Sequence, residues 1–206
     1  LLGTTGISQP LSAPSQLESY QKELREKAQQ FDSLVFCLGE NGLDLAQKSG
    51  INPQQLIKTA NWLGPLFVTA GLEKVRSILL FGYHGKLIKL AGGIFHTHHH
   101  LADGRLEILV ANAAKMGLPT TSLQQLFACK TTEDGLQLLR QLDQDTGCDW
   151  TENIYQSIVE MIDKRTQAYI RKYVDFDVKI GSVLFGRDRT IIVTSETGKL
   201  LQNKLL

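Results

Sequence analysis

Ser77-Ile78-Leu79-Leu80-Phe81 decides the fold, because this short, continuous apolar run is followed at once by a turn and a helix. Gly82-Tyr83-His84-Gly85 is expected to form the turn, and helical spacing begins over Lys86–Ala91. A continuous apolar run of this length is typical of a strand that is buried on both faces of a sheet. The segment therefore predicts a buried strand, a loop and a helix in succession.

The same succession occurs twice upstream. Leu34–Leu38 is an apolar run closed by Gly39-Glu40-Asn41-Gly42, and a short helical stretch follows it. Leu56–Thr59 predicts a second strand, Asn61 punctuates the chain, and Trp62–Glu73 has helical spacing. Strands that alternate with helices predict a parallel sheet with helices on both of its faces.

Helical spacing dominates the second half of the chain. Three helices are predicted between residues 102 and 142, and a long helix follows Gly147. Two β-type runs, Val183–Phe185 and Thr190–Val193, flank the charged turn Gly186–Arg189. We therefore expect an α/β fold with a mainly parallel, Rossmann-like sheet, a helical second half and a short β-rich tail.

These patterns divide the chain into three parts. Residues 1–32 are expected to be a lead-in segment with one helix, and residues 33–146 an α/β domain that binds cofactor and substrate. Residues 147–206 would form the long helix and the C-terminal strands, packed on the same domain.

The composition is that of an ordinary globular protein. Of the 206 residues, 42% are hydrophobic and 21% are charged, which excludes a disordered, collagen-like or coiled-coil chain. The net charge of +1 gives no bulk attraction to nucleic acid or to an anionic membrane, and no apolar run approaches the length of a membrane helix. The three cysteines, Cys37, Cys129 and Cys148, form no CxxC pair, which favours a reducing compartment. We expect a cytoplasmic protein without a nucleic-acid or membrane partner.

All five histidines lie between positions 84 and 100, a clustering that no packing requirement explains. A solvated loop, a metal site and a substrate site are the competing interpretations. His96 and His98, or His98 and His100, would lie on the same side of an extended segment and could share an ion. A catalytic zinc usually takes three protein ligands from more than one element, however, and no histidine lies elsewhere in the chain. We therefore expect no metal and assign the segment to substrate binding.

Charged side chains flank the histidines. Lys86, Lys89 and Arg105 would bind the carboxylates of an acidic substrate, with Arg105 making bidentate contacts. Asp103 and Glu107 are four positions apart and would share one face of a helix that begins near residue 102. We expect both carboxylates to orient Arg105 and His98. The alternatives are that Asp103 only caps the helix and that Glu107 only pairs with Arg105 or a solvent-exposed cation.

The loops after the predicted strands are the expected place for a cofactor. In open α/β sheets ligands lie beyond the carboxyl ends of the strands, where glycine admits close approach and helix N-termini offer N–H groups. Asn61 would bond ribose hydroxyls or, alternatively, cap the following helix. Neither a P-loop nor a strict dinucleotide motif is present, which argues against nucleoside-triphosphate hydrolysis. The residues assigned to the cofactor are Gly39, Asn41, Gly42, Asn61, Gly82 and Gly85.

Longer strings match a known family. Leu2–Ser12, then Gly82–Phe95, then Thr97-His98 with Ala102–Glu107 together resemble the CbiD family, the cobalt-precorrin-5B C1-methyltransferases of the anaerobic cobalamin pathway. The resemblance extends to about residue 142 and is looser after Gly147. This family usually carries Asn-Thr-His-Ser where the chain has His-Thr-His-His at positions 96–99, and the family's opening motif Gly-Tyr-Thr-Thr-Gly-Thr is not present.

The resemblance implies methyl transfer from S-adenosylmethionine to C1 of a cobalt-precorrin, which is a tetrapyrrole. It implies that the glycine loops hold the cofactor and that the substrate is held by Lys86, Lys89, Thr97 and Arg105. A general base would be His84 or His98, since imidazole titrates near neutrality. The chain would then be the C-terminal portion of the enzyme, with the N-terminal domain of the same polypeptide as a partner; homo-oligomerisation stays open.

Two other functions remain open. A metal-dependent hydrolase would explain the histidines, although not the repeated strand–loop–helix units. A non-catalytic ligand-binding domain would explain the lack of the opening motif.

Overall fold

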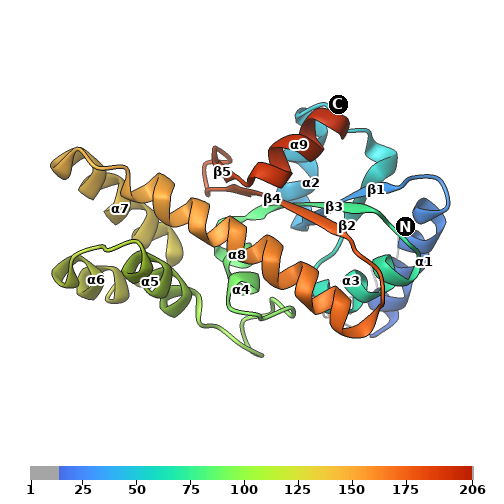
Figure 1. The fold of residues 1–206 in the computed structure, drawn as a ribbon, viewed down its shortest axis with the longest axis horizontal. Coiled ribbons are helices and arrows are strands. Elements are labelled where there is room, and N and C mark those ends of the chain that lie inside the picture. Colours follow the sequence, from blue (N-terminus) through green and yellow to red (C-terminus); the bar gives the residue numbers. More distant parts are fainter. Residues whose placement is uncertain (1–13, 206) are drawn as a thin grey trace, which may run out of the picture.

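A five-stranded sheet forms the centre of the computed structural model, which describes residues 14–205 (Figure 1). The strand order is β2-β1-β3-β4-β5; the first four of these are parallel to one another, and β5 pairs antiparallel with β4. The predicted α/β class and the three predicted parallel strands are confirmed. The strands are β1 (Ser33–Leu38), β2 (Leu56–Lys58), β3 (Ser77–Tyr83), β4 (Lys179–Phe185) and β5 (Ile191–Thr194).

The Rossmann-like detail of the expectation is not confirmed. β2 and β3 lie on opposite sides of β1 although the chain forms them in succession, and the sheet ends on an antiparallel strand. The strand order therefore reverses between β1 and β3, and such a reversal is where open α/β sheets bind ligands.

Helices cover both faces of the sheet, as predicted (Figure 1). α2 and α9 pack on one face, α1, α3, α4 and α8 pack on the other, and α5, α6 and α7 gather around the far end of α8. The helices are α1 (Pro14–Ala28), α2 (Gly39–Lys48), α3 (Leu63–Leu72), α4 (His84–Ala91), α5 (Arg105–Lys115), α6 (Thr120–Phe127), α7 (Thr132–Thr146), α8 (Trp150–Tyr173) and α9 (Glu196–Leu205).

The central strands are buried on both faces. Leu34 and Phe36 of β1 point into the core shared with α3 and α8, whereas Val35 and Cys37 point into the core shared with α2. All six residues of β1 are buried. A strand with two covered faces has no polar side, which is why its signal in the sequence is a continuous apolar run and not an alternation.

Two of the predicted loops are wrong. Gly39–Gly42 forms the first turn of α2, and β3 continues through Tyr83 directly into α4. One residue suffices to turn the chain from β1 into α2, because Gly39 has a φ of +76°, a conformation open to glycine. Gly42 lets α2 approach the sheet, since an added Cβ would lie 2.8 Å from the carbonyl oxygen of Phe81.

The start of α5 also differs from the expectation. The helix begins at Arg105 and not near residue 102, because Gly104, with a φ of +83°, turns the chain immediately before it. Asp103 therefore precedes the helix and shares no helical face with Glu107. The N-cap residue is Gly104, although Oδ1 of Asp103 accepts a hydrogen bond from the backbone N–H of Arg105, the first residue of α5, at 3.4 Å.

The end of the chain completes the sheet. β4 pairs with β3 over its whole length, from Ser77 opposite Lys179 to Tyr83 opposite Phe185. The predicted turn between the two C-terminal strands is confirmed. α9, which the sequence analysis did not predict, packs on β4. The division into residues 1–32, 33–146 and 147–206 stays a prediction, although the last part supplies a strand to the interior of the sheet.

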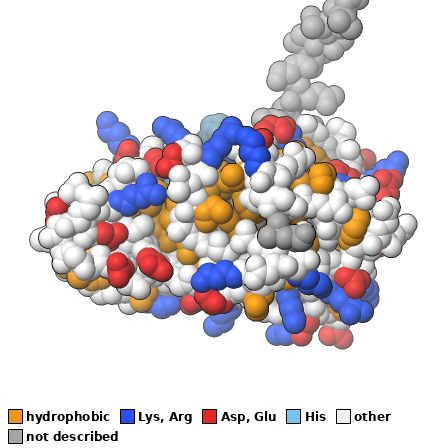
Figure 2. Space-filling view, turned by 90° about the horizontal axis from the view of Figure 1, so that it is seen from above, with side chains coloured by type: hydrophobic (Ala, Val, Ile, Leu, Met, Phe, Trp, Pro, Cys, Tyr) orange, Lys and Arg blue, Asp and Glu red, His pale blue; other side chains and the backbone are white. Residues whose placement is uncertain are grey.

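The surface is mixed in charge. Figure 2 shows basic and acidic side chains interspersed over one face of the molecule, with apolar side chains between them. Within residues 14–205, no helix combines the length and the apolar character needed to cross a membrane. Leu2–Ser12, which carries part of the family resemblance, lies outside the described residues.

Candidate functional site

A pocket of about 310 Å³ lies beside the start of α4. Four segments form it: the loop after β2, the first turns of α4, the histidine-rich loop between α4 and α5, and the first residue of α5. The sequence analysis had assigned every lining residue except His99 to the site, and the pocket brings the four substrate-binding candidates together. Its lining residues are Asn61, Gly85, Lys86, Lys89, Thr97, His98, His99 and Arg105.

Lys89 anchors the histidine-rich loop from below. Its side chain is 1% exposed, and Nζ donates hydrogen bonds to the carbonyl oxygens of Thr97 at 3.2 Å and Ala102 at 2.6 Å. Burial lowers the pKa of Lys89. An ammonium group has three N–H donors, so one remains for a ligand in the pocket. Lys89 thus anchors the loop, and its role in substrate binding stays a prediction.

Asn61 fixes the same loop from the side. Its Oδ1 accepts a hydrogen bond from the Thr97 hydroxyl at 3.0 Å, and its backbone oxygen accepts one from the Thr97 N–H at 3.2 Å. The preceding residue, Ala60, has a φ of +45°, which is uncommon for alanine and is of the kind that functional loops hold. The alternative role of Asn61 as a helix cap is wrong, because Trp62 is the N-cap residue of α3 and no side chain caps the helix.

Arg105 is held by Asp103. Nε and Nη2 of Arg105 donate to the two carboxylate oxygens at 2.6 Å and 2.7 Å, which is the bidentate geometry of a strong ion pair. These hydrogen bonds lower the pKa of Asp103. Asp103 is thus in position to orient Arg105, and its role toward a ligand stays a prediction. The other N–H groups of the guanidinium stay available to a ligand.

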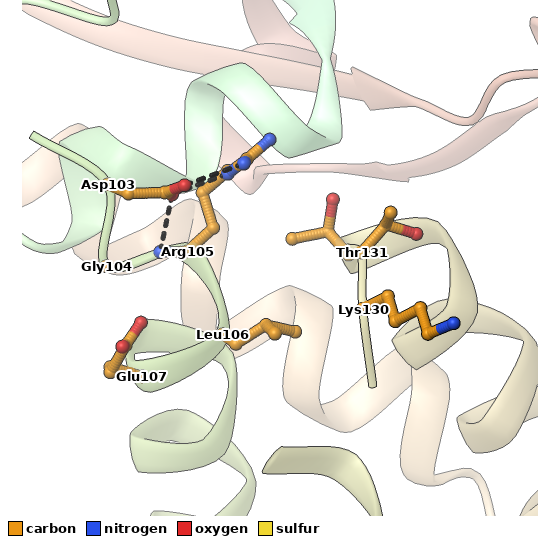
Figure 3. A pocket seen from close by; sticks show the side chains of 8 residues that line it. Asp103, Gly104, Arg105, Leu106, Glu107, Lys130 and Thr131 are labelled. Atoms are coloured by element: carbon orange, nitrogen blue, oxygen red, sulfur yellow. Dashed lines mark hydrogen bonds and ion pairs between the residues drawn. The ribbon is translucent and has the colours of Figure 1, made fainter. Parts of the chain in front are cut away.

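A smaller pocket of about 180 Å³ adjoins Arg105 on its other side. Figure 3 shows Asp103 facing the guanidinium, with Lys130 and Thr131 across the pocket. Glu107, in the first turn of α5, also lines this pocket, away from the Asp103–Arg105 pair in the same view. No hydrogen bond or ion pair joins Glu107 to Arg105 within the described residues, so its orienting role stays a prediction.

The charge in the larger pocket is positive. Lys86 is exposed at its rim, and Lys89 lies buried at its floor. Neither lysine forms an ion pair with another side chain in residues 14–205, and the carboxylate of Asp103, which lies near Lys89, is bound to Arg105. Two cations without an acidic partner, next to hydrogen-bond donors, make the pocket suited to an anionic ligand.

His98, His99 and His100 form a cluster of rings, and the first two of them line the pocket. The rings of His98 and His99 lie 4.9 Å apart at 15°, and His100 lies 4.0 Å from His99. His96 instead packs edge-on against Trp62. The proximity of His100 lowers the pKa of His99, which favours the neutral ring. Among residues 14–205, no three His, Cys, Asp or Glu side chains gather where they could hold a metal ion.

His84 does not reach the pocket. Its side chain is fully buried, with Nε2 3.1 Å from Oε2 of Glu133 and Nδ1 2.8 Å from the Tyr155 hydroxyl. Burial lowers the pKa of His84, and a neutral ring that donates from Nε2 and accepts at Nδ1 satisfies both partners. The structure therefore disfavours His84 as the general base. His98, the other candidate, is the one that lines the pocket.

Glu133 is a residue that the sequence analysis missed. Its Oε2 also accepts hydrogen bonds from the Tyr83 hydroxyl at 3.3 Å and from the backbone N–H of Arg187 at 3.2 Å. The carboxylate thus joins α7 to the ends of β3 and β4. A search for carboxylates near the histidines in sequence could not find it, because it lies 49 positions from His84.

The residues assigned to the cofactor are not gathered in one place. Asn61 and Gly85 line the pocket, whereas Gly42 and Gly82 lie where an added Cβ would meet backbone or neighbouring side chains. Asn41 accepts a hydrogen bond from Arg189 at 2.8 Å. Gly39 has open space beside it, at the start of α2. The cofactor assignment stays a prediction for these positions.

A cationic pocket beside the carboxyl edge of a mainly parallel α/β sheet is the kind of site at which α/β domains bind small anionic ligands. A comparison with known proteins shows which family part of this domain matches. The C-terminal domain of CbiD matches residues 96–196. Residues 96–196 thus match the CbiD family that the sequence resemblance indicated.

Curated relatives match along the whole chain. A cobalt-precorrin-5B C(1)-methyltransferase of Cyanothece is 60% identical over 205 residues, which are 100% of this chain and 54% of the relative. Proteins of the same name from Synechocystis and Nostoc are 55% and 54% identical over 100% of this chain and 54% and 56% of their own lengths. The chain thus spans about half the length of these relatives. No solved structure gives a significant match.

Proposed function

We propose that this chain is part of a methyltransferase that transfers a methyl group from S-adenosylmethionine to C1 of a cobalt-precorrin. The observation that carries the proposal is the pocket in which Lys86, Lys89 and Arg105 converge beside His98. The names of the relatives supply the substrate class, and the chemistry of the pocket agrees with it. Precorrins are tetrapyrroles with carboxylate side chains, and these cations would pair with such groups.

The pocket suits the substrate better than the cofactor. The sulfonium group of S-adenosylmethionine carries a positive charge, which Lys86 and Lys89 would repel. The glycines assigned to the cofactor fit it only in part, because the space beside Gly42 and Gly82 is already filled. We therefore assign this pocket to the carboxylates of the macrocycle.

The residues of the pocket would act mainly by positioning the ring. Methyl transfer between bound partners needs no covalent enzyme intermediate, and correct orientation alone can supply roughly 7–11 kcal/mol of the barrier. Lys86 and Arg105 would hold carboxylates, and the Asp103 ion pair would keep the guanidinium from rotating away. His98 would accept a proton if the ring loses one after methylation.

Methyl transfer by the full-length protein tests the proposal. Lys86→Ala should raise KM for the cobalt-precorrin about tenfold, since a charge-assisted contact is worth about 1.5–3 kcal/mol and an exposed lysine retains the lower part of it. Lys199→Ala is the matched control, because Lys199 is exposed on α9 and pairs with Glu196. Unchanged kinetics of Lys86→Ala, together with activity that a chelator removes and a divalent metal restores, would instead favour a metal-dependent enzyme.

A further inference from the structure

We propose that His99 is an axial ligand to the cobalt of the bound tetrapyrrole, so that the macrocycle lies across the mouth of the pocket. This inference rests on the proposed function, because it requires a cobalt tetrapyrrole at this site. It gives a role to His99, which the proposed binding of substrate carboxylates by Lys86, Lys89 and Arg105 (the carboxylate clamp) does not use.

His99 lines the pocket and has ring nitrogens that can bind a metal. Its side chain is exposed and lines the pocket beside Lys86 and Arg105. Nδ1 of His98 accepts the backbone N–H of His100 at 3.3 Å, whereas the ring nitrogens of His99 make no hydrogen bond within the described residues. Neutral imidazole is the commonest metal ligand in proteins, and it binds through such an unoccupied nitrogen.

The neighbouring rings hold His99 in position. His98 is nearly parallel to it at 4.9 Å, and His100 lies 4.0 Å from it and 5.2 Å from His98, so the three rings contact one another. A ring that already contacts two neighbours loses less freedom when it binds a metal, so less of the binding free energy is spent on ordering it. The run of consecutive histidines, which neither core packing nor carboxylate binding requires, would then serve to present a single ligand.

A cobalt tetrapyrrole needs only one such ligand. Its macrocycle supplies the equatorial nitrogens, and a single imidazole can complete the coordination, as the proximal histidine does for haem iron. A resident metal ion would require three or four protein groups. The histidine cluster beside the pocket can supply the single ligand that a cobalt tetrapyrrole needs.

The size of the pocket agrees with a ring that stays outside it. A volume of about 310 Å³ lies at the low end for ligand pockets and suits the carboxylate arms of a tetrapyrrole, not the whole macrocycle. The arms would enter toward the buried Lys89, while the metal at the centre of the ring would face the exposed His99. Ligation at the centre and ion pairs at the rim together fix which face of the ring the protein covers.

Cobalt(II) uroporphyrin I and metal-free uroporphyrin I are the probes, since both carry the carboxylates and only the first carries the metal. The full-length protein should bind the cobalt form at least about tenfold more tightly. The electron paramagnetic resonance spectrum of the complex should show the superhyperfine triplet of one axial nitrogen. His99→Ala should abolish the triplet and the tenfold preference while leaving the affinity for the metal-free form unchanged, and His100→Ala should retain the triplet.

The outcomes separate the two proposals. If both forms bind equally and no triplet is seen, or if the triplet survives in His99→Ala, the axial ligation is refuted while the carboxylate clamp stands. If neither form binds, or if Lys86→Ala leaves the affinity for metal-free uroporphyrin unchanged, the proposed function fails and the ligation fails with it.

Discussion

Replacement of Lys89 by methionine should loosen the histidine-rich loop, because this one ammonium group holds the loop at two carbonyl oxygens. Methionine keeps most of the apolar stem that packs in the core and removes the charge. Each charge-assisted hydrogen bond is worth about 1.5–3 kcal/mol, but water can reach carbonyls of a surface loop once it opens. We therefore expect a loss of about 2–3 kcal/mol in the free energy of unfolding.

Thermal unfolding and amide hydrogen exchange of the full-length protein measure this effect. For a domain of this size, 1 kcal/mol corresponds to about 2–4 °C, so Tm should fall by about 4–12 °C. Exchange should become faster over residues 92–104 in particular. Lys86→Met is the matched control, since Lys86 lies on the same helix with an exposed side chain, and it should cost less than about 0.5 kcal/mol. Equal Tm values for the two variants, with unchanged exchange in the loop, would refute the anchoring role.

Three further variants test other parts of the structure. Burial raises the pKa of Asp163 to about 7, so the folded protein binds a proton that the unfolded chain releases near pH 4, and stability should fall as pH rises between these values. In Asp163→Asn, Tm should no longer fall as the pH rises over this range, and at pH 8 the variant should be more stable than the unchanged protein. An unchanged dependence of Tm on pH would contradict the raised pKa of Asp163. Gly181→Ala places a Cβ 2.5 Å from the backbone nitrogen of Gly198 and should destabilise the protein by about 1–3 kcal/mol in urea unfolding, whereas a neutral effect would show that α9 does not pack on β4. Asn61→Ala removes the hydrogen bond to Thr97. It should reduce the free energy of ligand binding, measured by calorimetry, by more than the free energy of unfolding, measured from Tm. The reverse order would make Asn61 purely structural.

The parallel strands could be predicted because their signal is local. Leu34–Leu38 and Ile78–Phe81 are buried on both faces, and a strand in that setting must be apolar throughout. The place of β4 could not be predicted in the same way. Its pairing with β3 joins segments about a hundred residues apart, and the register depends on how α8 packs across the sheet.

The candidate site could be predicted in composition but not in geometry. Lys86, Lys89 and Arg105 stand near the histidines in sequence, so their grouping follows from chain proximity. The burial of His84 does not follow, because its partner Tyr155 is 71 positions away on α8. The length of the loop after β1 does not follow from the sequence for a different reason: Gly39, with its positive φ, turns the chain within a single residue.

Fluorescence titration of metal-free uroporphyrin I into the full-length protein tests the central claim most directly, namely that this pocket binds the carboxylates of a tetrapyrrole. The account predicts saturable binding that weakens about tenfold in Lys86→Ala, consistent with the loss of one charge-assisted contact, and that is unchanged in Lys199→Ala. The uncharged methyl ester of the same porphyrin should bind far more weakly. Equal affinity of Lys86→Ala and Lys199→Ala, or equal binding of the ester, would contradict the account.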